Sequence, residues 1–215
     1  MELAGLIDIE VRLLVKIGPN GFRMEGMGRI NLAGGLLNLE IRLGIDVSPA
    51  GIALVADVTV DMNMLDLIKF NATGKLYINT GANGVTLAGI NVPGKSFFLK
   101  LSGSLTIIEI FKMQATVEIS VGSQFTRPEG TVGLSSGSQT ITLGKGEWGF
   151  AFSASVSFFG LVSVSIGGFV QSDGSFGAFF SGEILFGIRG FLGFGASISA
   201  SLFYTAESTV RSIET

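Results

Sequence analysis

The sequence of 215 residues contains no cysteine and no histidine. Without cysteine the chain has no disulfide and no thiolate nucleophile, and its redox compartment stays open. Without histidine it lacks the commonest metal ligand and the usual acid–base group near neutral pH. Serine–histidine and cysteine–histidine nucleophile pairs are therefore excluded. We predict no catalytic residue, no cofactor, no metal site and no enzymatic activity.

Charge is also scarce: charged residues make up 14% of the chain, and the net charge is −3. Such a chain has no basic field for gripping a phosphate backbone, so we expect no nucleic-acid partner. Hydrophobic residues reach 47%, and the mean hydropathy is +0.58. This content excludes disorder, and the 32 glycines follow no period of three that would indicate collagen.

The dominant pattern is an alternation of apolar and polar residues with period two. It runs through Ile7–Ile17, Leu37–Val47 and Phe111–Val121. Successive side chains of a strand point to opposite faces, so each segment has one apolar and one polar side. Clean alternation is typical of antiparallel sheets. Eleven residues span roughly 36 Å, about twice the length of a usual strand.

Two kinds of punctuation separate these segments. Polar turns containing Gly, Asn or Pro lie at 19–21, 48–51, 81–84, 145–146 and 172–174. The second kind of separator, which we call the apolar punctuation, is apolar and lies at Met64–Ile68, Ile107–Phe111 and Phe158–Val162. The apolar residues on its two sides have the same parity, that is, both sets are odd-numbered or both are even-numbered. Either a three-residue hairpin tip or a bend in one strand would preserve this parity. At Gly34-Gly35 the parity changes, which predicts a two-residue hairpin.

The punctuation recurs about every 30 residues, which indicates a degenerate repeat. We divide the chain into a charged-face section (1–122), an irregular loop or hairpin (123–145), a Gly/Phe/Ser-rich section (146–206) and a polar tail (207–215). In the third section we expect phenylalanine rings to lie over glycines of neighbouring strands. The fold class is thus all-β, a meander of long antiparallel amphipathic strands in a curled sheet that forms a groove, an open barrel or a closed barrel.

Carboxylates are the remaining candidates for chemistry. Asp57 and Asp61 share one strand face, as on any solvated sheet, and basic residues nearby are expected to pair with such acids. Asp66 and Glu109 lie in the apolar punctuation. Either they are acids with a raised pKa, or they occupy bends that need an outward-pointing residue, as Gly160 does; we favour the second interpretation.

Two interpretations of the sequence would place the chain in a membrane. A transmembrane helix over 184–204 would contain Arg189 and four glycines, and its tail alternates with period two, which favours a strand. An outer-membrane barrel suits strands of this length. It is disfavoured by the shortage of Trp and Tyr for aromatic belts, since the chain has 1 Trp and 2 Tyr.

The runs Gly21–Ile30 and Gly174–Ile184 share the pattern Gly-apolar-x-apolar with further glycines. They resemble the amphipathic β-repeats of AsmA/TamB-type lipid-transfer proteins. They also resemble β-repeats of bacterial surface proteins and exoproteins. The first resemblance implies an extended groove with an apolar inside, and the second implies a structural sheet.

We therefore expect a non-enzymatic β-repeat segment of a larger protein that accommodates lipid or another apolar ligand, in the cell envelope or outside the cell. The alternatives are an outer-membrane barrel with a polar lumen and a purely structural scaffold. Flanking repeats or self-association through edge strands are the expected protein partners. The candidate lipid-contacting residues are Leu39, Ile41, Leu43, Val58, Val60, Leu99, Leu101, Val117 and Ile119.

Overall fold

The computed structural model describes residues 7–32, 34–131, 137–188 and 192–206, and all regular elements among them are strands. The strands are β1 (Ile7–Gly18), β2 (Gly21–Leu32), β3 (Leu37–Ser48), β4 (Gly51–Met64), β5 (Ile68–Asn79), β6 (Val85–Leu87), β7 (Ile90–Val92), β8 (Ser96–Ile107), β9 (Phe111–Val121), β10 (Gln124–Arg127), β11 (Gln139–Thr142), β12 (Trp148–Phe158), β13 (Val162–Gln171), β14 (Phe176–Ile188) and β15 (Leu192–Tyr204).

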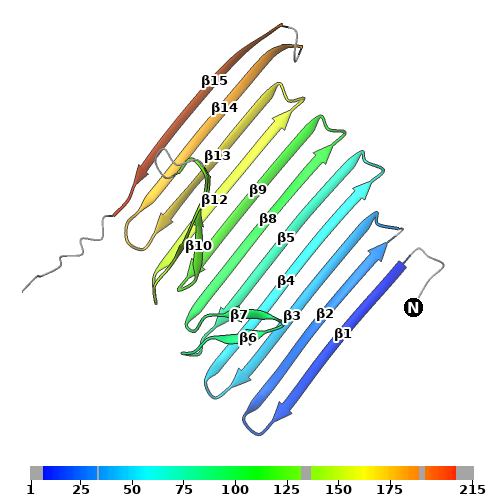
Figure 1. The fold of residues 1–215 in the computed structure, drawn as a ribbon, viewed down its shortest axis with the longest axis vertical. Helices are drawn as coiled ribbons and strands as arrows, with labels where there is room; N and C mark the ends of the chain where they lie inside the picture. The colour runs from blue at the N-terminus through cyan, green and yellow to red at the C-terminus, as the bar shows by residue number, and fades with distance from the viewer. Residues whose placement is uncertain (1–6, 33, 132–136, 189–191, 207–215) are drawn as a thin grey trace, which may run out of the picture.

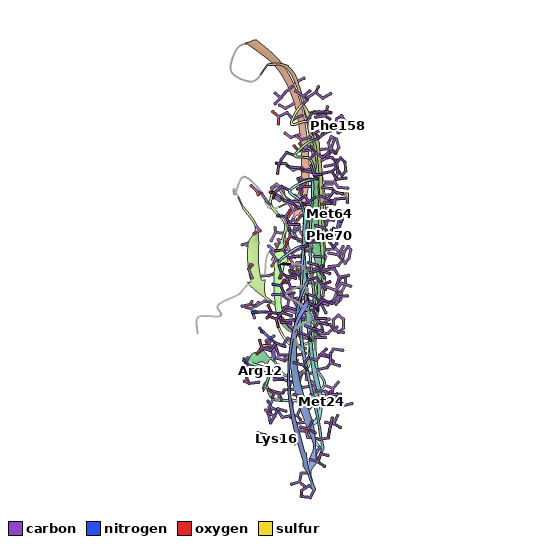
Figure 2. All side chains as sticks on the ribbon, turned by 90° about the vertical axis from the view of Figure 1, so that its right-hand side faces the viewer. Arg12, Lys16, Met24, Met64, Phe70 and Phe158 are labelled. Carbon is purple, nitrogen blue, oxygen red and sulfur yellow. The ribbon has the colours of Figure 1, made fainter. Side chains whose placement is uncertain are left out.

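Eleven of these strands form one sheet in the order β1-β2-β3-β4-β5-β8-β9-β12-β13-β14-β15, and every pairing is antiparallel (Figure 1). The sheet is a meander, interrupted by the small hairpins β6–β7 and β10–β11. The predicted all-β antiparallel meander is confirmed. The sheet is open, with β1 and β15 as its edges, and Figure 2 shows it from the side as one gently curved layer.

The apolar punctuation forms hairpin tips. Leu65-Asp66-Leu67 joins β4 to β5, and 108–110 and 159–161 join the next two pairs at the same end of the sheet. Of the two interpretations left open, the three-residue tip is therefore correct. The Gly34-Gly35 segment also joins two strands, with Leu32 opposite Leu37, although Ala33 lies outside the described residues.

The transmembrane-helix interpretation of 184–204 is wrong for the described part of that segment. The chain there forms the end of β14 and all of β15, which pair with each other through a register that includes Ile184↔Ala196. Alternation with period two had favoured this outcome, because a helix would bring residues three or four apart onto one face.

Both small hairpins pack on the polar side of the sheet. Beneath β6–β7, the buried side chains of Leu87 and Val92 contact Val55 of β4. Beneath β10–β11, Phe125 packs on Ala151 and Phe169. These two clusters are the buried hydrophobic cores of the described chain. The second hairpin lies within the segment 123–145, which the sequence predicts to be an irregular loop or hairpin.

Buried polar groups fix both hairpins to the sheet. Asn79 donates through Nδ2 to the carbonyl oxygens of Asn83 (2.8 Å) and Val92 (3.1 Å). Arg127 donates through Nε to Gln171 Oε1 (2.7 Å) and lies over the ring of Phe169.

Glu118 forms a corresponding anchor beneath β10. The side chain is 3% exposed, and Oε2 accepts a hydrogen bond from Lys100 Nζ at 2.8 Å. The other oxygen, Oε1, accepts one from the backbone N of Thr126 at 2.7 Å. A single carboxylate therefore links β8, β9 and the hairpin.

We predict that Glu118→Gln lowers the free energy of unfolding by about 1.5–3 kcal/mol, because hydrogen bonds to buried charged groups contribute that much. The matched control is Glu40→Gln on the same face. Glu40 forms longer ion pairs with Arg29 (3.5 Å) and Arg42 (3.9 Å) on an exposed surface, so its loss should cost about 0.5 kcal/mol or less. Urea denaturation checks both variants, and equal losses would contradict the anchoring role.

Candidate apolar docking surface

One whole side of the sheet is built from apolar residues, and we call it the apolar face. It comprises the odd-numbered residues of β1, β3, β8 and β9 and the even-numbered residues of β2, β4, β5, β12 and β13. In β14 and β15 it comprises the even-numbered residues of 176–184 and 196–204. All of them are Gly, Ala, Val, Leu, Ile, Met or Phe except Trp148 and Tyr204. In Figure 2, Met24, Phe70 and Phe158 project to this side, and Arg12 projects to the other.

The apolar face arises because, at every strand pairing, the register places the apolar residues of one strand opposite the apolar residues of the next. Leu39 lies opposite Val60, and Leu99 opposite Ile119. The side-chain period of a strand is two, so a slip of one residue in any pairing would turn the remaining strands over. No such slip occurs across the described sheet.

All nine predicted lipid-contacting residues lie on this face. Leu39, Ile41 and Leu43 of β3 are beside Val58 and Val60 of β4. Leu99 and Leu101 of β8 are beside Val117 and Ile119 of β9, and β5 lies between the two groups. None of the nine is buried. The structure thus brings them onto one continuous surface, and their contact with lipid stays a prediction.

A shallow hollow crosses the middle of the apolar face. Ala72, Gly103 and Ala115 occupy one row across β5, β8 and β9, and Ala154 continues the row on β12. Ala72, Gly103 and Ala115, with neighbours that include Val58 and Val60 of β4, line a hollow of about 540 Å³. Larger side chains, including Phe70, rise on the row above it. The alternation alone did not predict this hollow, although small residues at matched positions of the sequence are its signal.

The apolar surface continues over one end of the sheet. The three-residue tips carry six apolar residues that we call the tip row: Leu65, Leu67, Ile108, Ile110, Phe159 and Leu161. Neighbouring tips are joined through the backbone, since Ile108 N donates to Leu67 O at 2.6 Å and Phe159 N to Ile110 O at 2.5 Å. The tips thus form an ordered edge of the sheet.

Each tip holds a large apolar residue in an unfavourable conformation. Leu65 has a φ of 52°, Ile108 of 48° and Phe159 of 53°. Positive φ favours Gly or Asn and is a true outlier for a β-branched residue such as isoleucine. These side chains gain little from burial in return, because they are 78%, 54% and 55% exposed. Local folding preference therefore does not account for their presence.

The opposite end of the sheet is polar. Its turns are Pro19-Asn20, Pro49-Ala50 and Ser172-Asp173-Gly174. The two amphipathic rings of the apolar face, Trp148 and Tyr204, also lie at this end, at the first position of β12 and the last position of β15. The sheet is consequently apolar at one end and polar at the other, in addition to having two different faces.

Asp66 and Glu109 occupy the tips as exposed residues, and the interpretation that gave them a raised pKa is wrong. The pKa of Asp66 is lowered by a hydrogen bond from Asn63 and by Lys69, whose Nζ lies 3.3 Å from the carboxylate. The pKa of Glu109 is lowered by Lys112, whose Nζ lies at 2.6 Å. Both residues have positive φ, as Gly160 does at the equivalent position.

The polar side of the sheet contains a recess beside the hairpin β10–β11. It has a volume of about 330 Å³ and is lined by short hydroxyl and amide side chains, by Phe179 and by the Lys100–Glu118 pair. Both oxygens of Glu118 are already hydrogen bonded, so this carboxylate serves to hold the hairpin. Phe179 lies over Gly167 of the adjacent strand, which confirms the expected stacking of phenylalanine on glycine.

Comparisons with protein-family models, curated proteins and solved structures found no match. Among the described elements, no helix is long and apolar enough to cross a membrane. The case for a function therefore depends on the surfaces of the sheet.

We predict that the carboxyl groups of Asp66 and Glu109 titrate below the ordinary values of 3.8 and 4.5. A lowered pKa means that the tip ion pairs are intact at neutral pH and are lost as the pH falls through the pKa of the folded state. Carbon-13 NMR of the side-chain carboxyls measures both midpoints. Replacing Lys112 by Met should raise the pKa of Glu109, on which Lys69 still acts, and leave the pKa of Asp66 unchanged.

Proposed function

We propose that this chain is a non-enzymatic lipid-accommodating sheet, on which acyl chains cover the apolar face while the polar face contacts water. The observation that carries the proposal is the uninterrupted apolar face and its continuation onto the tip row. It refines the resemblance to lipid-transfer β-repeats, because the lipid-bearing surface would be an open face of the sheet.

The size of the face supports a role in binding. Twelve-residue strands are about 40 Å long, and eleven strands spaced by about 4.8 Å make a sheet about 48 Å wide. The apolar face thus covers on the order of 1,900 Å², whereas the largest apolar patch of a typical soluble monomer is about 300–600 Å². Such a surface needs an apolar cover.

The tip row favours lipid over a second protein sheet as that cover. A sheet packed on the apolar face would bury the face but leave the end of the hairpins in water. Leu65, Ile108 and Phe159 would then stay exposed in strained conformations. Acyl chains can cover both the face and the adjoining end, because they adapt to a surface that turns a corner.

The hollow supports acyl chains as the ligand. Its floor is formed by Ala72, Gly103 and Ala115, and this row of small residues runs across the strands. Rows on one face are separated by two residues, or about 6.7 Å along a strand. A missing row of side chains therefore leaves a channel of the width of a hydrocarbon chain between the two flanking rows.

We predict that the chain purified without detergent carries lipid in stoichiometric amounts, which mass spectrometry of an organic extract will detect. Leu101→Asp places a carboxylate on the apolar face beside the hollow and should reduce the bound lipid tenfold or more, because burying an unpaired polar group costs about 1–3 kcal/mol or more. Ser104→Asp, on the other face of the same strand, is the control and should retain lipid. A soluble, lipid-free wild type would support the structural-scaffold alternative.

The tips allow a second test in which stability and binding move in opposite directions. Replacing Leu65 and Ile108 by Asn, which tolerates positive φ, should raise the free energy of unfolding by about 1 kcal/mol per site. The same double variant should bind phosphatidylcholine vesicles at least tenfold more weakly, since each lost apolar side chain contributes about 1.5–3 kcal/mol when fully buried.

Ala50→Asn, in a turn at the polar end, is the matched control for vesicle flotation and should change binding little. If the Leu65/Ile108 variant lost stability and kept its binding, the tip row would have a structural role instead.

A further inference from the structure

The first strand of the sheet carries a feature that the lipid surface does not use. Strand β1 is an edge, paired with β2 alone, and its register runs unbroken from Ile7 to Gly18. It contains no proline and no bulge, and it is 12 residues long. Edge strands are usually protected from further pairing by a proline, by a bulge or by their short length. Among the described residues, no strand pairs with the outer backbone groups of β1, and these groups can therefore pair with another strand.

The charges of β1 are arranged in two halves. Asp8 and Glu10 lie in its first half, and Arg12 and Lys16 lie in its second half, all on the polar face. Arg12 forms an ion pair with Glu10 at 2.6 Å. Asp8 and Lys16 form no ion pair among the described residues. On β2 the residues directly opposite them are Asn31 and Arg23, so neither has an opposite charge directly across the pair.

We propose that β1 pairs antiparallel with β1 of a second copy of this chain, about a two-fold axis at Arg12 that is perpendicular to the sheet. In this register residue i lies opposite residue 24 − i. Asp8 then faces Lys16 of the second copy, and Ile7 faces Ile17. The pairing is isologous, so the charge contact occurs twice.

The register is selected by three requirements. Equal parity of the paired residues keeps both apolar faces on the same side, because a one-residue slip would turn one sheet over. Centring at Arg12 pairs the strand over Ile7–Ile17, an overlap as long as that centred at Leu13 and longer than that centred at Val11. It also unites the two charges that lack a partner. The two Arg12 side chains meet at the axis, where Glu10 of each copy is a diagonal neighbour.

The other edge strand, β15, has no charge pattern that could select a pairing register. Residues 192–204, which form β15, include no charged residue, so nothing on that strand distinguishes one register from another. Pairing through β1 would join two eleven-stranded sheets edge to edge and make one apolar face of twice the width.

The chain has no cysteine, so single cysteines can report the register directly. Experiments in a neutral detergent keep the apolar faces covered and suppress association through them. Arg12→Cys should give a disulfide-linked dimer under mild oxidation, because directly opposed Cβ atoms lie about 4.5–5.5 Å apart. Glu10→Cys should not, because the two copies of residue 10 are four residues apart along the pair. Equal cross-linking of both variants would overturn the register.

Charge reversal provides an independent measurement by sedimentation of the full chain. Asp8→Lys or Lys16→Asp alone puts like charges opposite each other and should weaken dimerisation tenfold or more. The double variant restores opposite charges and should restore dimerisation to within about threefold of wild type. A double variant as weak as the singles, or a wild type that stays monomeric, would refute the pairing. The lipid content of the Leu101→Asp variant tests the proposed lipid binding separately, so a failure of dimerisation leaves that proposal unchanged.

Discussion

The constraint on which the structure depends is the agreement between a side-chain period of two and an unbroken strand register. Ten successive pairings keep the same residues on the same side of the sheet. The connections respect this requirement, whether they are two-residue turns, three-residue tips or inserted hairpins. If one connection were a residue longer, the strands beyond it would present charges on the apolar face. The apolar face is therefore a property of the whole chain.

The positions of the two hydrophobic cores follow from the same constraint. A one-layer sheet has no interior, so stability must come from strand pairing and from whatever covers its faces. The chain covers its polar face in two places, with β6–β7 over Val55 and β10–β11 over Ala151. Both hairpins are held by buried polar groups such as Asn79 and Glu118. The described chain places no hairpin on the apolar face, although it uses two hairpins to cover parts of the polar face.

The sequence predicted the features that follow from the alternation of apolar and polar residues. It could not separate two backbone geometries that place the flanking residues on the same faces. Long strands, antiparallel pairing and the nine candidate residues on one face follow from the alternation around Leu39 and Val117. A three-residue tip and a bend at Asp66 place the flanking residues alike, so parity had no means to separate them. Curvature and closure depend on small changes in twist that leave the alternation unchanged. The lowered pKa of Asp66 depends on Lys69, whose approach the alternation does not encode.

The hairpin β6–β7 was missed for a different reason. Its two short strands continue the alternation, so Val85 was indistinguishable from the start of another sheet strand. A signal was present elsewhere, in the run Ile52–Ala56, where apolar residues occupy both faces of β4. In β4 this run coincides with the hairpin that packs on the polar side of the strand. The same argument applies to Ala151, which lies between Phe150 and Phe152 and is covered by β10–β11. The two-sided runs around Val55 and Ala151 thus coincide with the hairpins on the polar face, and no part of the described chain covers the apolar side of the same strands.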